Sequence, residues 1–261
     1  PFWDYLNFPV FFLSGGNPIA VAWFWIFLII IFLLAGFQIA KKIFNETTAY
    51  FFVLLMSIYF IYYSNAFTHP AGALMISLLF FYTFWQYLAT FRVKYLAFTA
   101  IILGLMIQLE IANGIPLLFL TVVLTTLVQI KRKKLSHSLA FLFILIPLST
   151  YILFDIRHEF FQLKHALKFV GDATGKNMGR LFILKNRLDY MSNLGAEITR
   201  IAQVNRILLV LLLLALVKLT RDGVSKKFYM FFLFFLFGFY LFSFLIPLAF
   251  LRHHVIVFVP I

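Results

Sequence analysis

Titratable side chains are rare in this chain, and most of them fall where long apolar runs are interrupted. Glu110 is the sharpest case, because the segment LMIQLEIANGIP places its carboxylate between two apolar runs. A charged side chain at membrane depth costs about 2.5–3.5 kcal/mol on insertion scales, so it should face a cavity or a partner. Glu110 is therefore a candidate catalytic residue. The alternative is a wetted carboxylate with a structural role at the membrane interface.

A second polar group, FDIRHEF, directly follows an apolar run. Its Arg157 and His158 are candidate ligands for a phosphate, because cationic donors form strong hydrogen bonds to phosphate oxygens. Asp155 is a candidate catalytic carboxylate. The alternative for Asp155 is an ordinary helix N-cap, a position at which aspartate is favoured.

A third group, LRHH, follows the last long apolar run. Arg252 and His253 are further candidates for binding a phosphate, although side chains of this kind also extend to lipid head groups. His69, which precedes a proline at the start of another apolar run, is a weaker candidate of the same type.

Familiar catalytic signatures are missing from the sequence. It has no cysteine, no serine-nucleophile elbow, no HExxH zinc motif, no Walker motif and no nucleotide fingerprint. This argues against nucleotide-dependent chemistry in a soluble domain. No cofactor is predicted, and the sequence leaves the use of a divalent metal open.

The composition indicates the elements that must position these residues. The chain is 64% hydrophobic and only 12% charged, whereas soluble domains average about 25% charged residues. Its apolar runs are continuous, which favours helices, and helices satisfy their own backbone hydrogen bonds in lipid. We expect one all-α, polytopic transmembrane helical bundle over residues 1–261, with about eight spans and the start of a ninth. The expected spans are 18–37, 47–63, 70–88, 95–109, 114–130, 136–154, 207–217 and 228–251, followed by 255–261.

The interval from Asp155 to Arg206 is the one long polar segment. Apolar residues recur in it at helical spacing, which predicts one amphipathic helix from Asp155 and another from Arg180. Helices of this kind lie in the membrane interface. We therefore expect an extracytoplasmic amphipathic insert over residues 155–206.

Basic residues sort the expected connections into two sets. Alternate connections hold 12 of the 22 lysines and arginines, and the positive-inside rule places that set in the cytoplasm. The other set holds seven of the nine carboxylates and five of the six histidines. The net charge of +13 is explained by residues that flank membrane helices, so nucleic-acid binding is not expected.

The order of these features resembles that of bacterial membrane glycosyltransferases of the GT-C type, in the family 39-like group of protein mannosyltransferases and aminoarabinose transferases. The matching stretches are FFLSGGNPIAVAWFWIFL (11–28), AKKIFNETTAYFFVLLMSIYFIYYSNAFTHP (40–70), KYLAFTAIILGLMIQLEIANGIPLLFL (94–120), IPLSTYILFDIRHEF (146–160) and LRHHVIVFVPI (251–261). The resemblance implies a multi-pass enzyme of the bacterial inner (cytoplasmic) membrane. Such an enzyme transfers a sugar from a polyprenyl-phosphate carrier to a lipid, glycan or protein acceptor on the extracytoplasmic face.

The chain departs from the family pattern at its start. In this family the principal catalytic aspartate follows the first transmembrane helix, whereas Pro1 corresponds to the end of that outer loop, so we expect the main base upstream of Pro1. The sequence begins without methionine and stops within an apolar run, which predicts an excerpt cut at both ends. Two alternatives stay open: a transporter or lipid flippase that uses Glu110 as an intramembrane polar group, and a non-catalytic assembly subunit.

Overall fold

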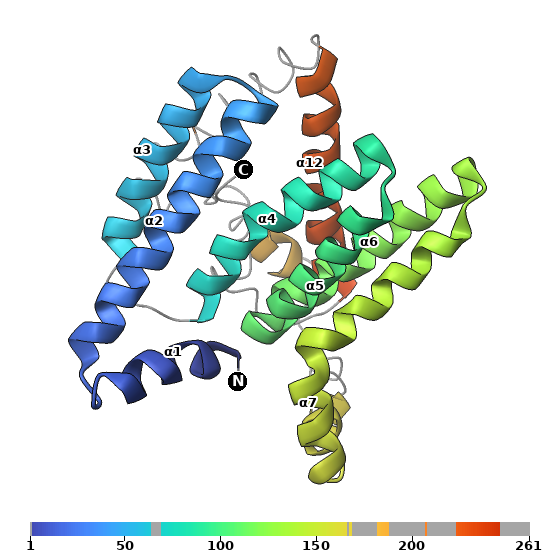
Figure 1. The fold of residues 1–261 in the computed structure, drawn as a ribbon. Helices are drawn as coiled ribbons and strands as arrows, with labels where there is room; N and C mark the ends of the chain where they lie inside the picture. Colours follow the sequence, from blue (N-terminus) through green and yellow to red (C-terminus); the bar gives the residue numbers. More distant parts are fainter. Residues whose placement is uncertain are drawn as a thin grey trace.

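The computed structural model describes residues 2–63, 69–165, 167–168, 182–187, 207 and 223–245, and the regular elements in these ranges are helices (Figure 1). They are α1 (Phe2–Leu13), α2 (Pro18–Ile43), α3 (Glu46–Tyr63), α4 (His69–Thr90), α5 (Val93–Leu109), α6 (Ile111–Arg132), the 3-10 helix η1 (Leu135–Ile144), α7 (Leu145–Arg157) and α12 (Gly223–Leu245).

The described helices are those of a multi-pass membrane protein. Within the described residues, five segments are long and apolar enough to cross a membrane: α2, Ala71–Thr90 in α4, α6, η1 with α7, and Lys227–Phe244 in α12. The apolar helices α3 and α5 are shorter. The predicted count of eight spans is not confirmed, because the predicted span 207–217, apart from residue 207, and the segment 255–261 lie outside the described residues.

One predicted span has a different local structure. We expected a single helix over 136–154, whereas η1 occupies Leu135–Ile144 before α7 begins. Pro147 lies in the first turn of α7, where its missing N–H is tolerated.

The connections between helices lie at two ends of the bundle (Figure 1). The α2–α3, α4–α5 and α6–η1 connections and the start of α12 share one end, which we call the basic end. Its described lysines and arginines are Lys41, Lys42, Arg92, Lys94, Lys131, Arg132, Lys133, Lys134, Lys226 and Lys227. The opposite end, which we call the acidic end, holds α1, the start of α4, the α5–α6 break and the end of α7. The described basic residues of the set predicted to be cytoplasmic therefore lie together at one end of the bundle.

Aromatic packing joins α4 to α12 in the centre of the bundle. Phe80 and Phe84 of α4 pack edge to face on Phe235 of α12, with ring centroids 5.6 and 5.7 Å apart. All three side chains are fully buried. Since lipid is as apolar as these side chains, close packing and ring geometry hold the two helices together, and each ring pair adds about 0.5–1.5 kcal/mol.

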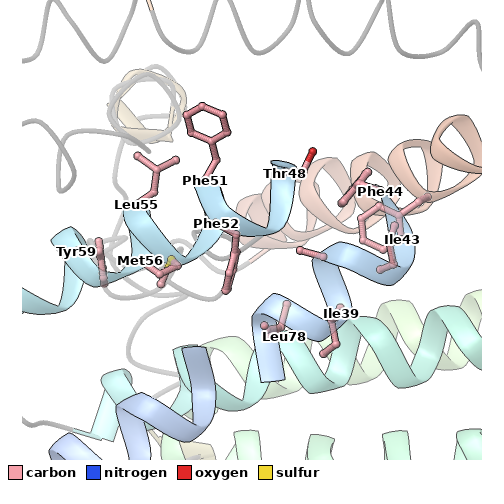
Figure 2. Close-up of a pocket in the computed structure, with 13 residues that line it drawn as sticks. Ile39, Ile43, Phe44, Thr48, Phe51, Phe52, Leu55, Met56, Tyr59 and Leu78 are labelled. Carbon is pink, nitrogen blue, oxygen red and sulfur yellow. The ribbon is translucent and has the colours of Figure 1, made fainter. Parts of the chain in front are cut away.

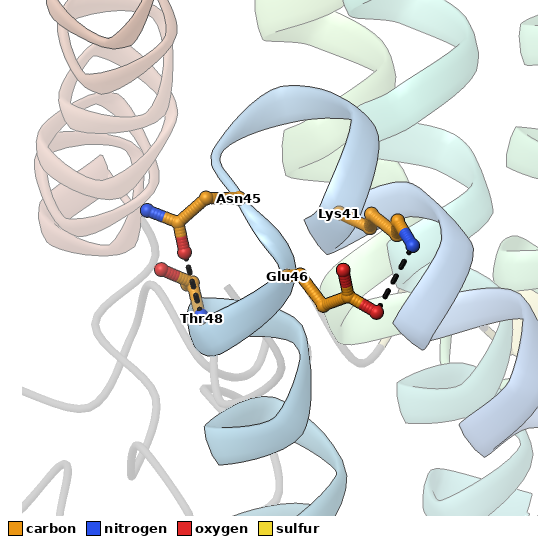
Figure 3. Close-up of polar contacts among 4 residues, drawn as sticks. All are labelled: Lys41, Asn45, Glu46 and Thr48. Carbon is orange, nitrogen blue, oxygen red and sulfur yellow. Dashed lines mark hydrogen bonds and ion pairs between the residues drawn. The ribbon is translucent and has the colours of Figure 1, made fainter.

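Asparagine caps begin two of the membrane helices. The Asn17 Oδ1 accepts a hydrogen bond from the backbone N–H of Ile19 at 2.9 Å, just after a turn formed by Gly15 and Gly16. The Asn45 Oδ1 accepts from the N–H of Thr48 at 2.8 Å at the start of α3 (Figure 3). Each cap satisfies an N–H group that the helix itself leaves unpaired.

Helices α5 and α6 approach closely at Gly114. A Cβ atom on this residue would lie 2.6 Å from the Ile107 Cα, so α5 backbone occupies the space that a side chain would need. The absence of a side chain at Gly114 therefore allows the tight α5–α6 hairpin, and this hairpin positions Glu110 between the two helices.

We predict that Gly114→Ala destabilises the bundle by about 1–3 kcal/mol, the usual cost of overpacking. Gly238→Ala is the matched control, because its nearest neighbour is the Leu120 side chain, which can rotate away. Thermal unfolding of the purified protein in detergent should give a lower midpoint for Gly114→Ala than for Gly238→Ala. Equal midpoints would contradict the role assigned to the close approach.

Candidate functional site

Glu110 forms the whole of the break between α5 and α6. Its backbone is extended, with φ −151° and ψ 96°, and it separates the last residue of α5 from the first of α6. The Glu110 N–H donates to the Met106 carbonyl at 2.8 Å, and its own carbonyl accepts from Asn113 and Gly114 at 3.0 and 2.9 Å. The predicted break between the spans 95–109 and 114–130 is thus confirmed, but it consists of one residue.

The Glu110 side chain is buried, with 7% of its surface exposed. It lies at the N-terminus of α6, where the helix dipole favours a negative charge. Gln108 and Asn113, both buried, flank it along the chain. Glu110 is therefore enclosed by protein and not exposed at the surface of the bundle.

Gln108 connects this break to α7. Its side-chain Nε2 donates to the Pro147 carbonyl and, at 3.2 Å, to the Thr150 hydroxyl. Hydrogen bonds of this kind hold helices together inside a membrane. They fix α7 beside the end of α5 from which Glu110 projects.

Arg187 is a buried cation that the sequence analysis did not single out. Its side chain is 3% exposed, and its Nη2 donates to the Ser243 carbonyl of α12 at 3.2 Å. Its Nη1 donates to the Asn186 side chain at 2.8 Å. Ser243 lies in the last turn of α12, so Arg187 belongs to the acidic end.

A signal for Arg187 was present in the sequence. It lies three residues after Leu184 and one before Leu188, and this spacing puts it beside the apolar stripe of the helix predicted from Arg180. A cation on an apolar stripe is a candidate for burial against a partner.

An apolar cavity of about 260 Å³ reaches the residue before Glu110. It is lined by α1, α2, α4 and α5, including Leu6, Trp25, Met75 and Leu109. The Trp25 Nε1 donates to the Asn7 side chain at 2.8 Å, which fixes α1 across the acidic end of this cavity. The apolar lining suits a hydrocarbon chain, and Glu110 itself is not part of it.

The structure corrects the role predicted for Asp155 as the N-cap of a helix that begins there. Asp155 lies near the end of α7, which stops at Arg157, and the turn over 158–160 interrupts the predicted amphipathic helix. Both Asp155 carboxylate oxygens accept backbone N–H groups of the next helical segment, from Gln162 at 2.8 Å and Leu163 at 3.1 Å. Asp155 therefore caps a helix that starts six residues later than expected.

The two predicted phosphate ligands at this end of α7 face outward. Arg157 and His158 are exposed, and α7 has no buried residue. The His158 ring stacks on Phe154 with centroids 4.0 Å apart, and its Nδ1 lies 2.8 Å from the Phe154 carbonyl. His158 is therefore held along α7 near Asp155, at the surface of the acidic end.

Of the remaining predicted site residues, the structure describes only His69. His69 begins α4 at the acidic end. Arg252 and His253, like most of the predicted insert over 155–206, lie outside the described residues. Within the described part of the chain, no group of three or more histidines or carboxylates could hold a metal ion.

Comparison with protein-family models, with curated proteins and with solved structures finds no match to this chain.

We predict that Asp155→Ala loosens the helical segment after α7, because two N–H groups lose their acceptor. The expected cost is about 1 kcal/mol, as for other helix caps. Hydrogen exchange should be faster at the amides of Gln162 and Leu163. Glu159→Ala, which removes an exposed carboxylate in the same turn, serves as control and should leave both amides unchanged. Unaltered exchange in Asp155→Ala would refute the capping role.

Proposed function

We propose that this chain belongs to an integral membrane glycosyltransferase that moves a sugar from a polyprenyl-phosphate carrier to an acceptor at the acidic end. The observation that carries the proposal is the buried Glu110 carboxylate, which directly follows Leu109, a lining residue of an apolar cavity. This arrangement supports a substrate that combines a hydrocarbon chain with a polar reacting group.

The reaction requires a base for the acceptor and a cation for the leaving group. The acceptor hydroxyl attacks the anomeric carbon of the sugar and loses its proton to the base. The bond between that carbon and the phosphate oxygen breaks, and polyprenyl phosphate leaves with the electron pair. A fixed cation that stabilises the developing phosphate charge is worth most in a site of low dielectric.

Glu110 and Arg187 have the chemistry for parts of these roles. A buried carboxylate can accept a proton or a hydrogen bond from a hydroxyl. A buried guanidinium can bind a phosphate through two donors. Both residues lie at the acidic end, where the sequence also places Arg157, His158 and Arg252. If another residue of the enzyme is the main base, Glu110 orients the sugar or the acceptor.

The distribution of basic residues predicts on which side of the membrane the acidic end lies. The positive-inside rule predicts that the basic end is cytoplasmic, so the acidic end is extracytoplasmic. Sugars on polyprenyl-phosphate carriers are used on that face in the family that the sequence resembles.

We predict that Glu110→Gln lowers the rate of sugar transfer by about 100-fold, within the range of general acid–base catalysis. The assay uses the full-length enzyme in proteoliposomes, with polyprenyl-phosphate-linked mannose, glucose or aminoarabinose as donor. Glu159→Gln, which makes the same change at an exposed position, should stay within about twofold of the parent enzyme.

Three results would contradict the proposal. The first is full turnover by Glu110→Gln, and the second is equal loss in both variants. The third is the absence of any transfer together with a Glu110-dependent flux of polyprenyl phosphate across the bilayer. That last result would establish the transporter or flippase alternative.

A further inference from the structure

A second apolar cavity, of about 240 Å³, opens between α2, α3 and α4 toward the basic end (Figure 2). Ile39 and Ala40 line it from α2, and Phe52 and Met56 line it from α3. Leu78 of α4 lies at its side, and Phe228 of α12 also contributes to the lining. We call this cavity the α2–α3 groove.

The groove has the dimensions of a hydrocarbon chain. Its lining residues on α3 extend from Thr48 to Tyr59, which is about 16 Å at 1.5 Å per residue. The surface between these two residues is aliphatic and aromatic. Thr48 lies in the first turn of α3, so the groove begins near the α2–α3 connection and runs along α3 toward Tyr59.

Cations lie at the basic end, toward which the groove opens. Lys41 and Lys42 directly follow the lining residue Ala40, and the exposed Lys227 precedes the lining residue Phe228. The rings of Phe44 and Phe228 are 5.6 Å apart, so the start of α12 lies against this turn. The described carboxylate among these residues is Glu46, which leaves an excess of positive charge.

The two lysines of α2 are held in place yet able to bind a further acceptor. The Lys42 Nζ donates to the Tyr82 hydroxyl at 2.9 Å, one turn along α4 from Leu78. The Lys41 Nζ lies 3.1 Å from the Glu46 carboxylate, in an exposed ion pair (Figure 3). An ammonium group has three donors, and exposed ion pairs are weak and easily exchanged.

We propose that the α2–α3 groove binds one acyl chain of an anionic phospholipid, with the headgroup phosphate held by Lys41, Lys42 and Lys227. Charge complementarity selects an anionic lipid over a zwitterionic one, as in other basic pockets at helix ends. The site lies at the end of the bundle opposite to Glu110. It does not depend on the catalytic proposal, and it provides a lipid contact at the basic end.

The test measures binding of dioleoylphosphatidylglycerol to the purified full-length protein by native mass spectrometry. Ala40→Phe and Leu55→Trp each fill the groove, and Leu55→Trp changes a side chain that is 48% exposed, so the fold should tolerate it. Lys41→Gln with Lys42→Gln removes two of the cations. Each of these three variants should weaken binding by about tenfold. The two larger side chains exclude the acyl chain from the groove, and the lysine variant removes cations that attract the anionic headgroup.

Matched controls separate this site from general lipid binding. Ala35→Phe fills the other apolar cavity from the same helix, and Lys133→Gln with Lys134→Gln removes two cations elsewhere at the basic end. Both should stay within about twofold of the parent protein. Dioleoylphosphatidylcholine should bind more weakly than dioleoylphosphatidylglycerol, and glycerol phosphate should not compete.

The proposal is overturned if Leu55→Trp and the lysine variant bind dioleoylphosphatidylglycerol like the parent protein. It is also overturned if Ala35→Phe weakens binding as much as Ala40→Phe, or if glycerol phosphate displaces the lipid. Sugar transfer, measured separately, reports on the catalytic proposal, so failure of one proposal is distinguishable from failure of the other.

Discussion

The cost of placing charge in hydrocarbon governs this structure. Each long apolar helix can cross a membrane only if its charged residues lie at its ends, and the described lysines and arginines flanking α2, α4, α6 and α12 do so. Because of this cost, a charged residue that is buried needs a specific structural setting. Glu110 and Arg187 are buried, and each is built into a helix junction or against a neighbouring helix rather than left at the surface.

Helix packing without a hydrophobic driving force explains how the bundle holds these groups. Aromatic rings join α4 to α12, a glycine allows α5 and α6 to meet, and the Gln108 amide ties α5 to α7. The last two contacts converge on the break at Glu110. The polar residues at the acidic end are therefore positioned by the elements that hold the bundle together.

Much of the helical architecture was predictable from the sequence, because continuous apolar runs and their charged flanks determine where membrane helices begin and end. Glu110 was predictable for the same reason, since one carboxylate between two apolar runs interrupts the pattern. The helix that Asp155 caps could not be predicted in the same way. An aspartate near a helix boundary can belong to the end of one helix and still cap the start of the next. Only the three-dimensional turn over 158–160 determines which helix is capped, and positive φ angles at Glu159 and Phe160 form that turn.

Features that depend on contacts between distant segments could not be predicted. The position of Arg187 beside an apolar stripe marks it as a candidate for burial, but its partner on α12 lies more than fifty residues later in the chain and could not be inferred. The α2–α3 groove is a space that the side chains of four neighbouring helices leave unfilled. Hydrophobic periodicity describes single helices and carries little information about such combinations.

The orientation of the bundle in the membrane is the central claim, and labelling of single cysteines tests it most directly. Glu159→Cys and Lys133→Cys form a matched pair, because both positions are exposed turn residues with positive φ, at the acidic and basic ends respectively. The chain has no cysteine of its own. A membrane-impermeant maleimide added to intact cells should label position 159 and label position 133 only after the membrane is opened. Labelling of position 133 from outside, with protection of position 159, would contradict the orientation and the function built on it.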